Sequence, residues 1–387
     1  MKKETAIIAI ALFTTIGIGG CTQSNTQSEL ITVDVTASYP EKELILQNFM
    51  DVEYIPLEMN DKFITQGVVM AIGNKHILVK NWVHDGDIFV YDAKTGKALQ
   101  KINRKGQGPE EYTFISGIVL DEEKNEIFVN SFSTKKILVY DLLGNFKRSL
   151  EYAKGTEYSD VCNYDKNNLI CYDTAIYYKH GEKRDKQSYH AIISKQDGSI
   201  TQNISIPFDI IKAPVVIEGE GTVTTGMRTI IPYQNNWLLV ETSSDTVYHY
   251  DSKENKLNPF LVKTPAVDPE IMLSMGVLTD RYYFIKTVKK VFDLSTGKGF
   301  PITDLMYDKQ ENAVFNITVF NNDFTTKRKV NLNSNMVNGV IAAFQSIPAD
   351  QLVEAYENNE LKGKLKAIAA ELDEESNPVI MLMRYKK

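Results

Sequence analysis

Histidine and cysteine are scarce in this chain, which has five histidines and three cysteines among 387 residues. The histidines are scattered and form neither an HExxH nor an HxH pattern, so the common local zinc motifs are missing. No GxSxG sequence occurs either, which excludes the nucleophile elbow of α/β-hydrolases. A catalytic or metal site would therefore have to be assembled from distant parts of the chain.

Basic residues are also fewer than acidic residues. The chain has 43 Lys and Arg against 50 Asp and Glu, which gives a formal net charge of −7. Binding to phosphate backbones requires a basic face. We therefore expect no nucleic-acid partner.

A long apolar run occurs at the N-terminus, where Met1-Lys2-Lys3-Glu4 is followed by an apolar stretch from Thr5 to Gly20. The stretch has the length of a secretory signal region and is too short to span a bilayer comfortably. It ends in Ile18-Gly19-Gly20-Cys21, which resembles a bacterial lipobox. We predict a signal peptide over residues 1–20 and lipidation of Cys21; a plain signal peptide with an incidental cysteine, or an uncleaved anchor, are the alternatives.

The residues after Cys21 are polar and of a composition that stays unfolded, so we assign residues 21–30 to a flexible tether. No Asp follows the cysteine directly, and the inner-membrane retention signal of enteric bacteria is thus absent. The expected location is the cell envelope, with the lipid in the outer membrane and the protein facing the periplasm.

A short phrase recurs in the rest of the chain: an alternating apolar run, an aromatic residue and Asp, then a turn glycine. It occurs at Ile88–Gly96, Ile137–Gly144 and Lys290–Gly297, with weaker copies at Ile193–Gly198 and Tyr248–Asn255. Successive Asp positions are separated by 49, 56, 54 and 42 residues. Repeated β-rich units of this length are typical of a β-propeller.

We predict an all-β chain with a single six-bladed propeller domain over residues 31–387, seven blades being the alternative. The expected blades are Gly67–Ile102, Ile115–Leu150, Tyr158–Ile206, Thr229–Val262, a fifth containing Arg281–Lys286 and Lys290–Asp293, and a sixth beginning near Asn312–Phe320.

The C-terminal part interrupts the β pattern. Apolar residues at helical spacing predict a helical insertion at about 348–373. The apolar segment at 378–385 reads as a strand, and we expect it to close the ring with an early strand, either Ile31–Val35 or Val52–Glu58.

Cys162 and Cys171 flank a predicted hairpin turn at Asp165–Asn168. Symmetric pairing about that turn would place the two cysteines opposite each other, within reach of a disulfide. Buried free thiols are the alternative.

The phrase Lys105-Gly106-Gln107-Gly108-Pro109-Glu110-Glu111-Tyr112 lies between the first two blades. Together with the lipobox, the Tyr-Asp-x-x-Gly blades and Asn377-Pro378-Val379, it resembles the six-bladed β-propeller lipoproteins of Bacteroides and related gut bacteria, relatives of NHL-repeat propellers. The resemblance implies a fold and an envelope location. It supplies no catalytic motif.

Candidate ligand-binding residues are polar or aromatic side chains in expected loops, which could stack on sugar rings or grip a peptide. They are Trp82, His84, Arg104, Gln107, Glu110, Tyr112, Arg228 and Tyr233. The alternative for the two tryptophans is that Trp237 packs between blades and only Trp82 is exposed, and for Glu110 it is solvated surface charge.

We expect a lipid-anchored binding or scaffolding module for a glycan, peptide or envelope protein, with no cofactor and no assigned catalytic residue or metal. The alternative is a hydrolase or lyase centred on the axial channel, using a metal such as Ca²⁺. A structural role in a membrane complex is a third hypothesis, which an apolar patch on the outer face would favour.

Overall fold

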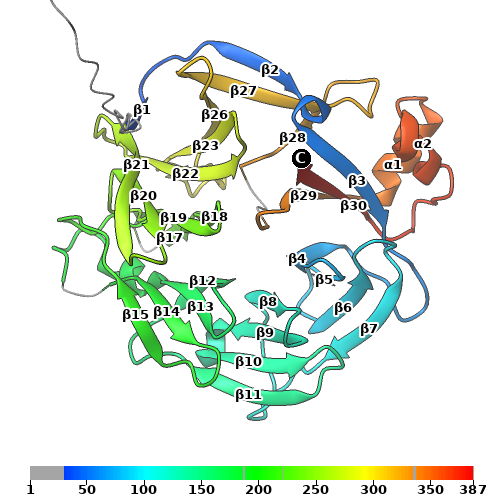
Figure 1. Ribbon diagram of the computed structural model, residues 1–387, viewed down its shortest axis with the longest axis horizontal. Coiled ribbons are helices and arrows are strands. Elements are labelled where there is room, and N and C mark those ends of the chain that lie inside the picture. Colours follow the sequence, from blue (N-terminus) through cyan, green and yellow to red (C-terminus); the bar gives the residue numbers. More distant parts are fainter. Residues whose placement is uncertain (1–29, 186–187, 220, 334–336, 387) are drawn as a thin grey trace, which may run out of the picture.

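Six β-sheets are arranged around a central axis in the computed structural model, which describes residues 30–185, 188–219, 221–333 and 337–386 (Figure 1). This confirms the predicted six-bladed β-propeller. The signal peptide, Cys21 and the tether lie outside the described residues, apart from residue 30. No helix in the described part is long and apolar enough to cross a membrane.

The first three blades are four-stranded antiparallel sheets, and each runs from an inner strand to an outer strand in chain order. Blade one contains β4 (Val68–Ile72), β5 (His76–Lys80), β6 (Asp87–Asp92) and β7 (Ala98–Asn103). Blade two contains β8 (Gly117–Asp121), β9 (Glu126–Ser131), β10 (Lys136–Asp141) and β11 (Phe146–Glu151). Blade three contains β12 (Tyr158–Asn163), β13 (Asn168–Asp173), β14 (His190–Ser194) and β15 (Ile200–Ile204).

Blades four and five each gain a strand from the N-terminus. Blade four contains β18 (Ile230–Tyr233), β19 (Asn236–Leu239), β20 (Thr246–Asp251) and β21 (Lys256–Thr264), with β1 (Ile31–Asp34) parallel to β21. Blade five contains β22 (Ile271–Leu278), β23 (Tyr282–Lys289), β26 (Ile302–Asp308) and β27 (Ala313–Asn321), with β2 (Glu41–Ile45) parallel to β27 and β28 (Arg328–Val330) antiparallel to it.

Blade six combines both ends of the chain. It has three strands among the described residues, in the order β29 (Ile341–Ile347), β30 (Val379–Tyr385) and β3 (Met50–Pro56). Helices α1 (Ala349–Glu357) and α2 (Gly363–Ala369) lie between β29 and β30, which confirms a small helical segment near the C-terminus. Because β3 continues into blade one and β30 pairs with it, the ring is closed by hydrogen bonds between chain ends.

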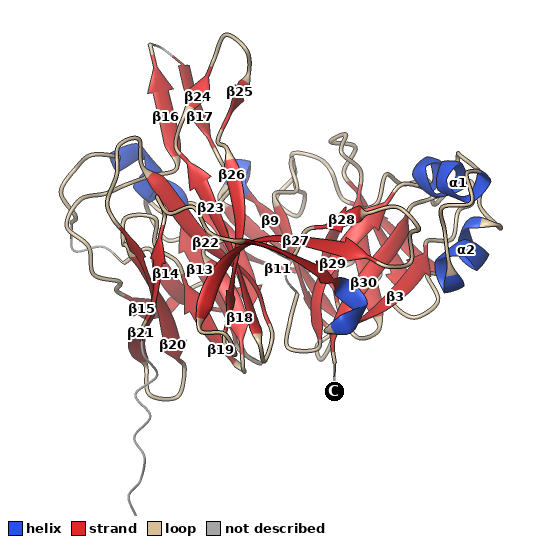
Figure 2. Ribbon diagram, turned by 90° about the horizontal axis from the view of Figure 1, so that it is seen from above, coloured by secondary structure: helices blue, strands red, loops and turns tan. Residues whose placement is uncertain are grey.

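Two short hairpins project from one face of the ring (Figure 2). They are β16 (Val215–Glu218) with β17 (Gly221–Thr224), and β24 (Phe292–Asp293) with β25 (Lys298–Gly299). Short 3₁₀ helices occur at η1 (Leu46–Asn48), η2 (Phe132–Thr134) and η3 (Thr174–Lys179).

The repeated aromatic-Asp phrase has a clear structural basis. Tyr91, Tyr140 and Tyr250 are fully buried and pack between blades. Each following Asp accepts hydrogen bonds from backbone N–H groups two to four residues later; Asp92, for example, bonds Lys94 and Thr95. This Asx turn reverses the chain between the third and fourth strands of the blade in chain order.

The glycine of the phrase permits close contact between blades. Gly96 has φ +69°, and a Cβ atom there would lie 1.9 Å from the Pro56 carbonyl oxygen on the neighbouring blade. A side chain at this position would therefore collide with the backbone of blade six.

The predicted boundaries of blades five and six were wrong. Asn312–Phe320 falls almost entirely within β27, the fourth strand of blade five, and blade six begins at β29. The phrase at Lys290–Gly297 lies in the projecting β24–β25 hairpin. The equivalent turn of blade five follows Tyr307-Asp308. There, the Asp308 carboxylate accepts hydrogen bonds from the N–H groups of Gln310 and Glu311.

Candidate functional site

An axial cavity of about 1350 Å³ lies inside the ring. The inner strands β4, β8, β12, β18 and β22 contribute to its wall, and β29 contributes from blade six. It extends along the strands from Ser116, Ser159 and Arg228 to the turns at Glu123 and Asp165. All six blades therefore converge on one site.

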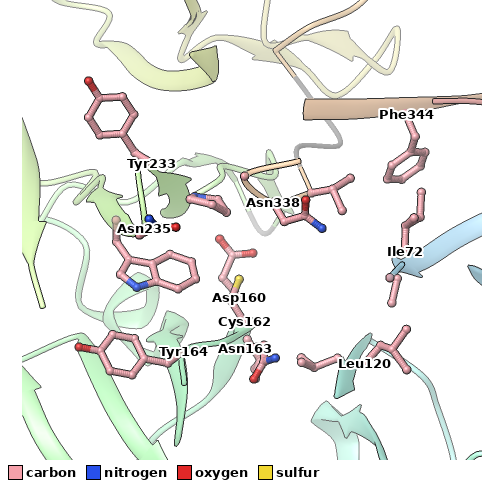
Figure 3. A pocket seen from close by; sticks show the side chains of 18 of the residues that line it. Ile72, Leu120, Asp160, Cys162, Asn163, Tyr164, Tyr233, Asn235, Asn338 and Phe344 are labelled. Atoms are coloured by element: carbon pink, nitrogen blue, oxygen red, sulfur yellow. The ribbon is translucent and has the colours of Figure 1, made fainter. Parts of the chain in front are cut away.

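Asp160 lies in the middle of the cavity wall (Figure 3). The pairing of β12 with β13 shifts between Tyr158 and Val161, so Asp160 sits in a β-bulge. Bulges re-aim side chains and are common beside functional sites. Its Oδ2 atom accepts hydrogen bonds from the Thr229 N–H and the Thr229 hydroxyl, both at 2.8 Å. Its Oδ1 atom accepts no hydrogen bond from any residue that the structure describes.

Amide side chains accompany Asp160 on this wall. Asn163 follows it on β12, Asn235 lies in the turn between β18 and β19, and Asn338 precedes β29. In the described part of the chain, the Asn163 and Asn235 side chains make no hydrogen bond, whereas Asn338 Oδ1 accepts from the N–H groups of Val340 and Ile341 at 2.8 Å. These amides can both donate and accept hydrogen bonds to a ligand.

The wall across from Asp160 is apolar. Ile72 and Leu120, from the inner strands of blades one and two, lie on the same side of the cavity in Figure 3 as Phe344 of β29. Aromatic rings also occur on the polar side, where Tyr164 stacks on Trp237 with ring centroids 6.1 Å apart. The cavity therefore has one hydrogen-bonding wall and one apolar wall.

Several charged groups at the rim are already paired with other blades. Lys195 binds Asp121 at 2.7 Å between blades two and three, and both side chains are almost fully buried. Glu122 accepts backbone N–H bonds from Asn74 and Lys75 of blade one. These charges stabilise contacts between blades.

Cys162 and Cys171 are free thiols, as in the second of the two alternatives, and the possible disulfide is not formed. The N–H groups of Tyr164 and Asp165 both bond the Asn168 carbonyl at 3.2 Å, and two residues therefore oppose one. This shifts the register, so that Cys162 pairs with Ile170 and Val161 with Cys171. Adjacent positions of a strand face opposite sides of the sheet. The two thiols consequently pack in different hydrophobic clusters.

The Cys162 thiol lines the cavity but is poorly suited to be a nucleophile. Burial raises its pKa to about 12, opposed by the positive charge of Arg228. The thiolate is the reactive form, so a thiol with this pKa stays protonated and unreactive near neutral pH. Among the described residues, no group of three His, Cys, Asp or Glu side chains could hold a metal ion.

Six of the eight predicted ligand-binding residues do not line the cavity. They are Trp82 and His84, between β5 and β6, and Arg104, Gln107, Glu110 and Tyr112, between β7 and β8. These connections lie at the opposite strand ends from the turns at Glu123 and Asp165. Trp82 is 71% exposed there.

The Arg104–Tyr112 segment serves as a structural turn. Tyr112 is fully buried; its hydroxyl donates to the Gly86 carbonyl at 2.7 Å and accepts from the Arg104 N–H at 2.9 Å. Arg104 Nε donates to the Gly144 carbonyl at 2.8 Å, and the Glu110 carbonyl accepts from the Tyr140 hydroxyl at 2.7 Å. The hydrogen bonds of this segment thus join blade one to blade two.

The other two predicted residues, Arg228 and Tyr233, do line the cavity. The Tyr233 hydroxyl, however, bonds the Tyr283 hydroxyl at 2.9 Å, and its ring packs edge-on against Phe260. Tyr233 therefore supports the wall, while Arg228 adds positive charge near Cys162.

Sequence reasoning missed Asp160, Asn163, Asn235 and Asn338, which share no local motif. The available signal was their position: each lies on or beside a strand that the repeat places next to the axis. A search for polar residues on inner strands and in the turns beside them would have included them.

Comparison with known proteins gives a fold-level match. A family model described as a 6-bladed beta-propeller matches residues 22–338. A solved structure from Bacteroides fragilis NCTC 9343, provisionally assigned as an exported protein, has 15% identity and a TM-score of 0.57, covering 90% of this chain and 100% of that one. A Bacteroides vulgatus ATCC 8482 protein has 9% identity and a TM-score of 0.47, covering 88% and 99%. No curated protein matches.

Proposed function

Because this chain belongs to a family of 6-bladed beta-propellers, we propose that it is an exported binding module of the cell envelope whose ligand occupies the axial cavity. The observation that carries the proposal is the cavity itself. It is lined from all six blades and joins a wall of hydrogen-bonding groups to an apolar wall. Ligand sites commonly combine these two features.

Export is supported by the apolar N-terminal segment and by the similarity to the Bacteroides fragilis protein. Attachment through lipid on Cys21, in the outer membrane and facing the periplasm, is the corresponding proposal for location. Metabolic labelling with a radioactive fatty acid tests it. The native chain should be labelled and membrane-bound, whereas Cys21→Ala should remain unlabelled.

Thermal unfolding of the chain from Thr22 onward, with and without candidate ligands, tests the binding function. The ligand classes are oligosaccharides, peptides and fragments of envelope proteins. A ligand at about 100 times its dissociation constant stabilises the folded state by about 2.7 kcal/mol. A ligand of this module should therefore raise the melting temperature by several degrees.

Two matched variants decide whether such a ligand sits in the cavity. Asn163→Trp places a large ring in the cavity, while Asn322→Trp makes the same change at an exposed position outside it. Binding should be lost in Asn163→Trp and retained in Asn322→Trp. Equal binding by both variants, or no stabilisation by any ligand class, would contradict the proposal.

A further inference from the structure

The Asp160 carboxylate is held in a fixed orientation with one oxygen left over. Thr229 on blade four supplies both hydrogen bonds to Oδ2, and the β-bulge in β12 sets the direction of the side chain. Oδ1 accepts no hydrogen bond from the described residues, and Asp160 is one of the residues that line the cavity. A carboxylate oxygen only accepts hydrogen bonds, so the matching ligand group must be a donor.

The neighbouring amides narrow the chemistry of that donor. Asn163 and Asn235 also line the cavity, and their side chains make no hydrogen bond within the described structure. A hydroxyl group can donate to Asp160 and at the same oxygen accept from a nearby amide. A peptide N–H or an ammonium group can only donate. The arrangement therefore favours a ligand with several hydroxyl groups.

The charge on this wall favours a neutral ligand. Asp160 is accompanied in the cavity by Arg228, and the two charges act in opposite directions on the pKa of Cys162. The described lining of the whole cavity has six Asp and Glu side chains and five Lys and Arg side chains, so its formal charges nearly balance. A strongly cationic or strongly anionic ligand would therefore meet like charges as well as opposite ones.

The rest of the cavity suits the remaining surface of a sugar. A sugar ring has hydroxyl groups at its edge and C–H groups on its faces, and the wall at Ile72, Leu120 and Phe344 offers apolar contact. At about 1350 Å³, the cavity exceeds the roughly 300–1,000 Å³ typical of pockets for drug-sized ligands. More than one sugar unit fits such a space.

We propose that the axial cavity binds a neutral oligosaccharide, with Asp160 accepting a hydrogen bond from a sugar hydroxyl and Asn163 and Asn235 bonding adjacent hydroxyls. This inference rests on the proposed function, because it names the ligand class of the same cavity.

Isothermal titration with short neutral gluco-, manno- and xylo-oligosaccharides tests the inference. The same titration with uncharged peptides and with oligosaccharides carrying uronic acids provides the comparison. At least one neutral oligosaccharide should bind. Asp160→Asn should weaken it by about ten- to a hundredfold, because a hydrogen bond to a charged group is lost.

Asp61→Asn is the matched control, since it makes the same substitution at an exposed position outside the cavity, where the Asp61 side chain makes no hydrogen bond in the described structure. It should leave affinity within about twofold of the native chain. Circular dichroism should show both variants folded.

The outcomes separate this inference from the proposed function. Cavity-dependent binding of peptides or acidic sugars, without binding of any neutral oligosaccharide, would overturn the saccharide assignment and keep the binding function. Neutral oligosaccharides that bind equally well to native chain and Asp160→Asn would overturn the role of Asp160. No cavity-dependent binding would overturn both proposals.

Discussion

Replacing Asn377 should loosen the closure of the ring. Its side chain is 2% exposed and lies just before β30, beside the segment that leads from blade six into blade one. Nδ2 donates to the carbonyls of Glu58 at 2.9 Å and Phe63 at 2.8 Å. Oδ1 accepts from the Thr65 N–H at 2.8 Å. One side chain therefore satisfies three backbone groups that are distant in sequence.

Asn377→Ala leaves these three backbone groups without their partner. An unsatisfied buried group costs about 1–3 kcal/mol, so three groups at the lower end of that range give a loss of about 3–5 kcal/mol. This is a large part of the roughly 5–15 kcal/mol that stabilises a folded domain. Urea unfolding followed by tryptophan fluorescence should show a lower midpoint with an unchanged slope.

Two further variants make the test specific. Asn377→Asp keeps the volume but cannot donate to the two carbonyls, so it should destabilise at least as much as alanine. Asn322→Ala removes an exposed amide that makes no side-chain hydrogen bond in the described structure, and it should change stability by less than about 0.5 kcal/mol. A loss below about 1 kcal/mol in both Asn377 variants would refute the reasoning.

Three other predictions follow from buried groups. Burial raises the pKa of Glu241 to about 7. The contribution of this group to stability should therefore be complete below about pH 4.5, and the unfolding free energy should fall by up to about 3 kcal/mol as pH rises to about 7. Glu241→Gln should flatten that part of a plot of unfolding free energy against pH. Lys195→Met should cost about 3–5 kcal/mol because Asp121 is left buried and unpaired, whereas Lys195→Met with Asp121→Leu should recover much of the loss in urea unfolding. Cys162 and Cys171 face opposite sides of their sheet, so treating the protein with an oxidant should change neither its mobility on a non-reducing gel nor its melting temperature. A mobility shift that Cys162→Ser abolishes would contradict the register.

The fold was predictable where each strand pair carries its own turn signal. In blades one and two, Tyr91-Asp92 and Tyr140-Asp141 mark the outermost hairpins in sequence, because a buried aromatic and an Asx turn are both local features. Blade five was misassigned because a similar phrase at Asp293 forms an Asx turn in the projecting hairpin. A local turn signal cannot tell a blade hairpin from an insertion.

The candidate site was less predictable, because it is made by the ring and not by any segment. The exposed Trp82 and the turn at Gln107 attract attention in the sequence, yet they lie at the opposite strand ends from the turns at the cavity rim. Asp160 and Asn235 are ordinary residues in sequence, and only the convergence of β12 and β18 brings them to one cavity. The two cysteines do not lie opposite each other for a similar reason, since one extra hydrogen bond at Asn168 changes which residues pair.

The pairing of β1, β2 and β3 with strands far along the chain has a consequence for the order of folding. Ile31 pairs with Leu261, Glu41 with Asn316 and Met50 with Tyr385, so the first strands of the chain have partners that are made much later. Pairing over such long separations is slow, because loop closure precedes any stabilising contact. In a chain that emerges N-terminus first, β1, β2 and β3 would stay without these partners until β21, β27 and β30, respectively, have been made. The first strands of the chain therefore complete their sheets late, and the pairing of β3 with β30 that closes the ring must wait for the last strand.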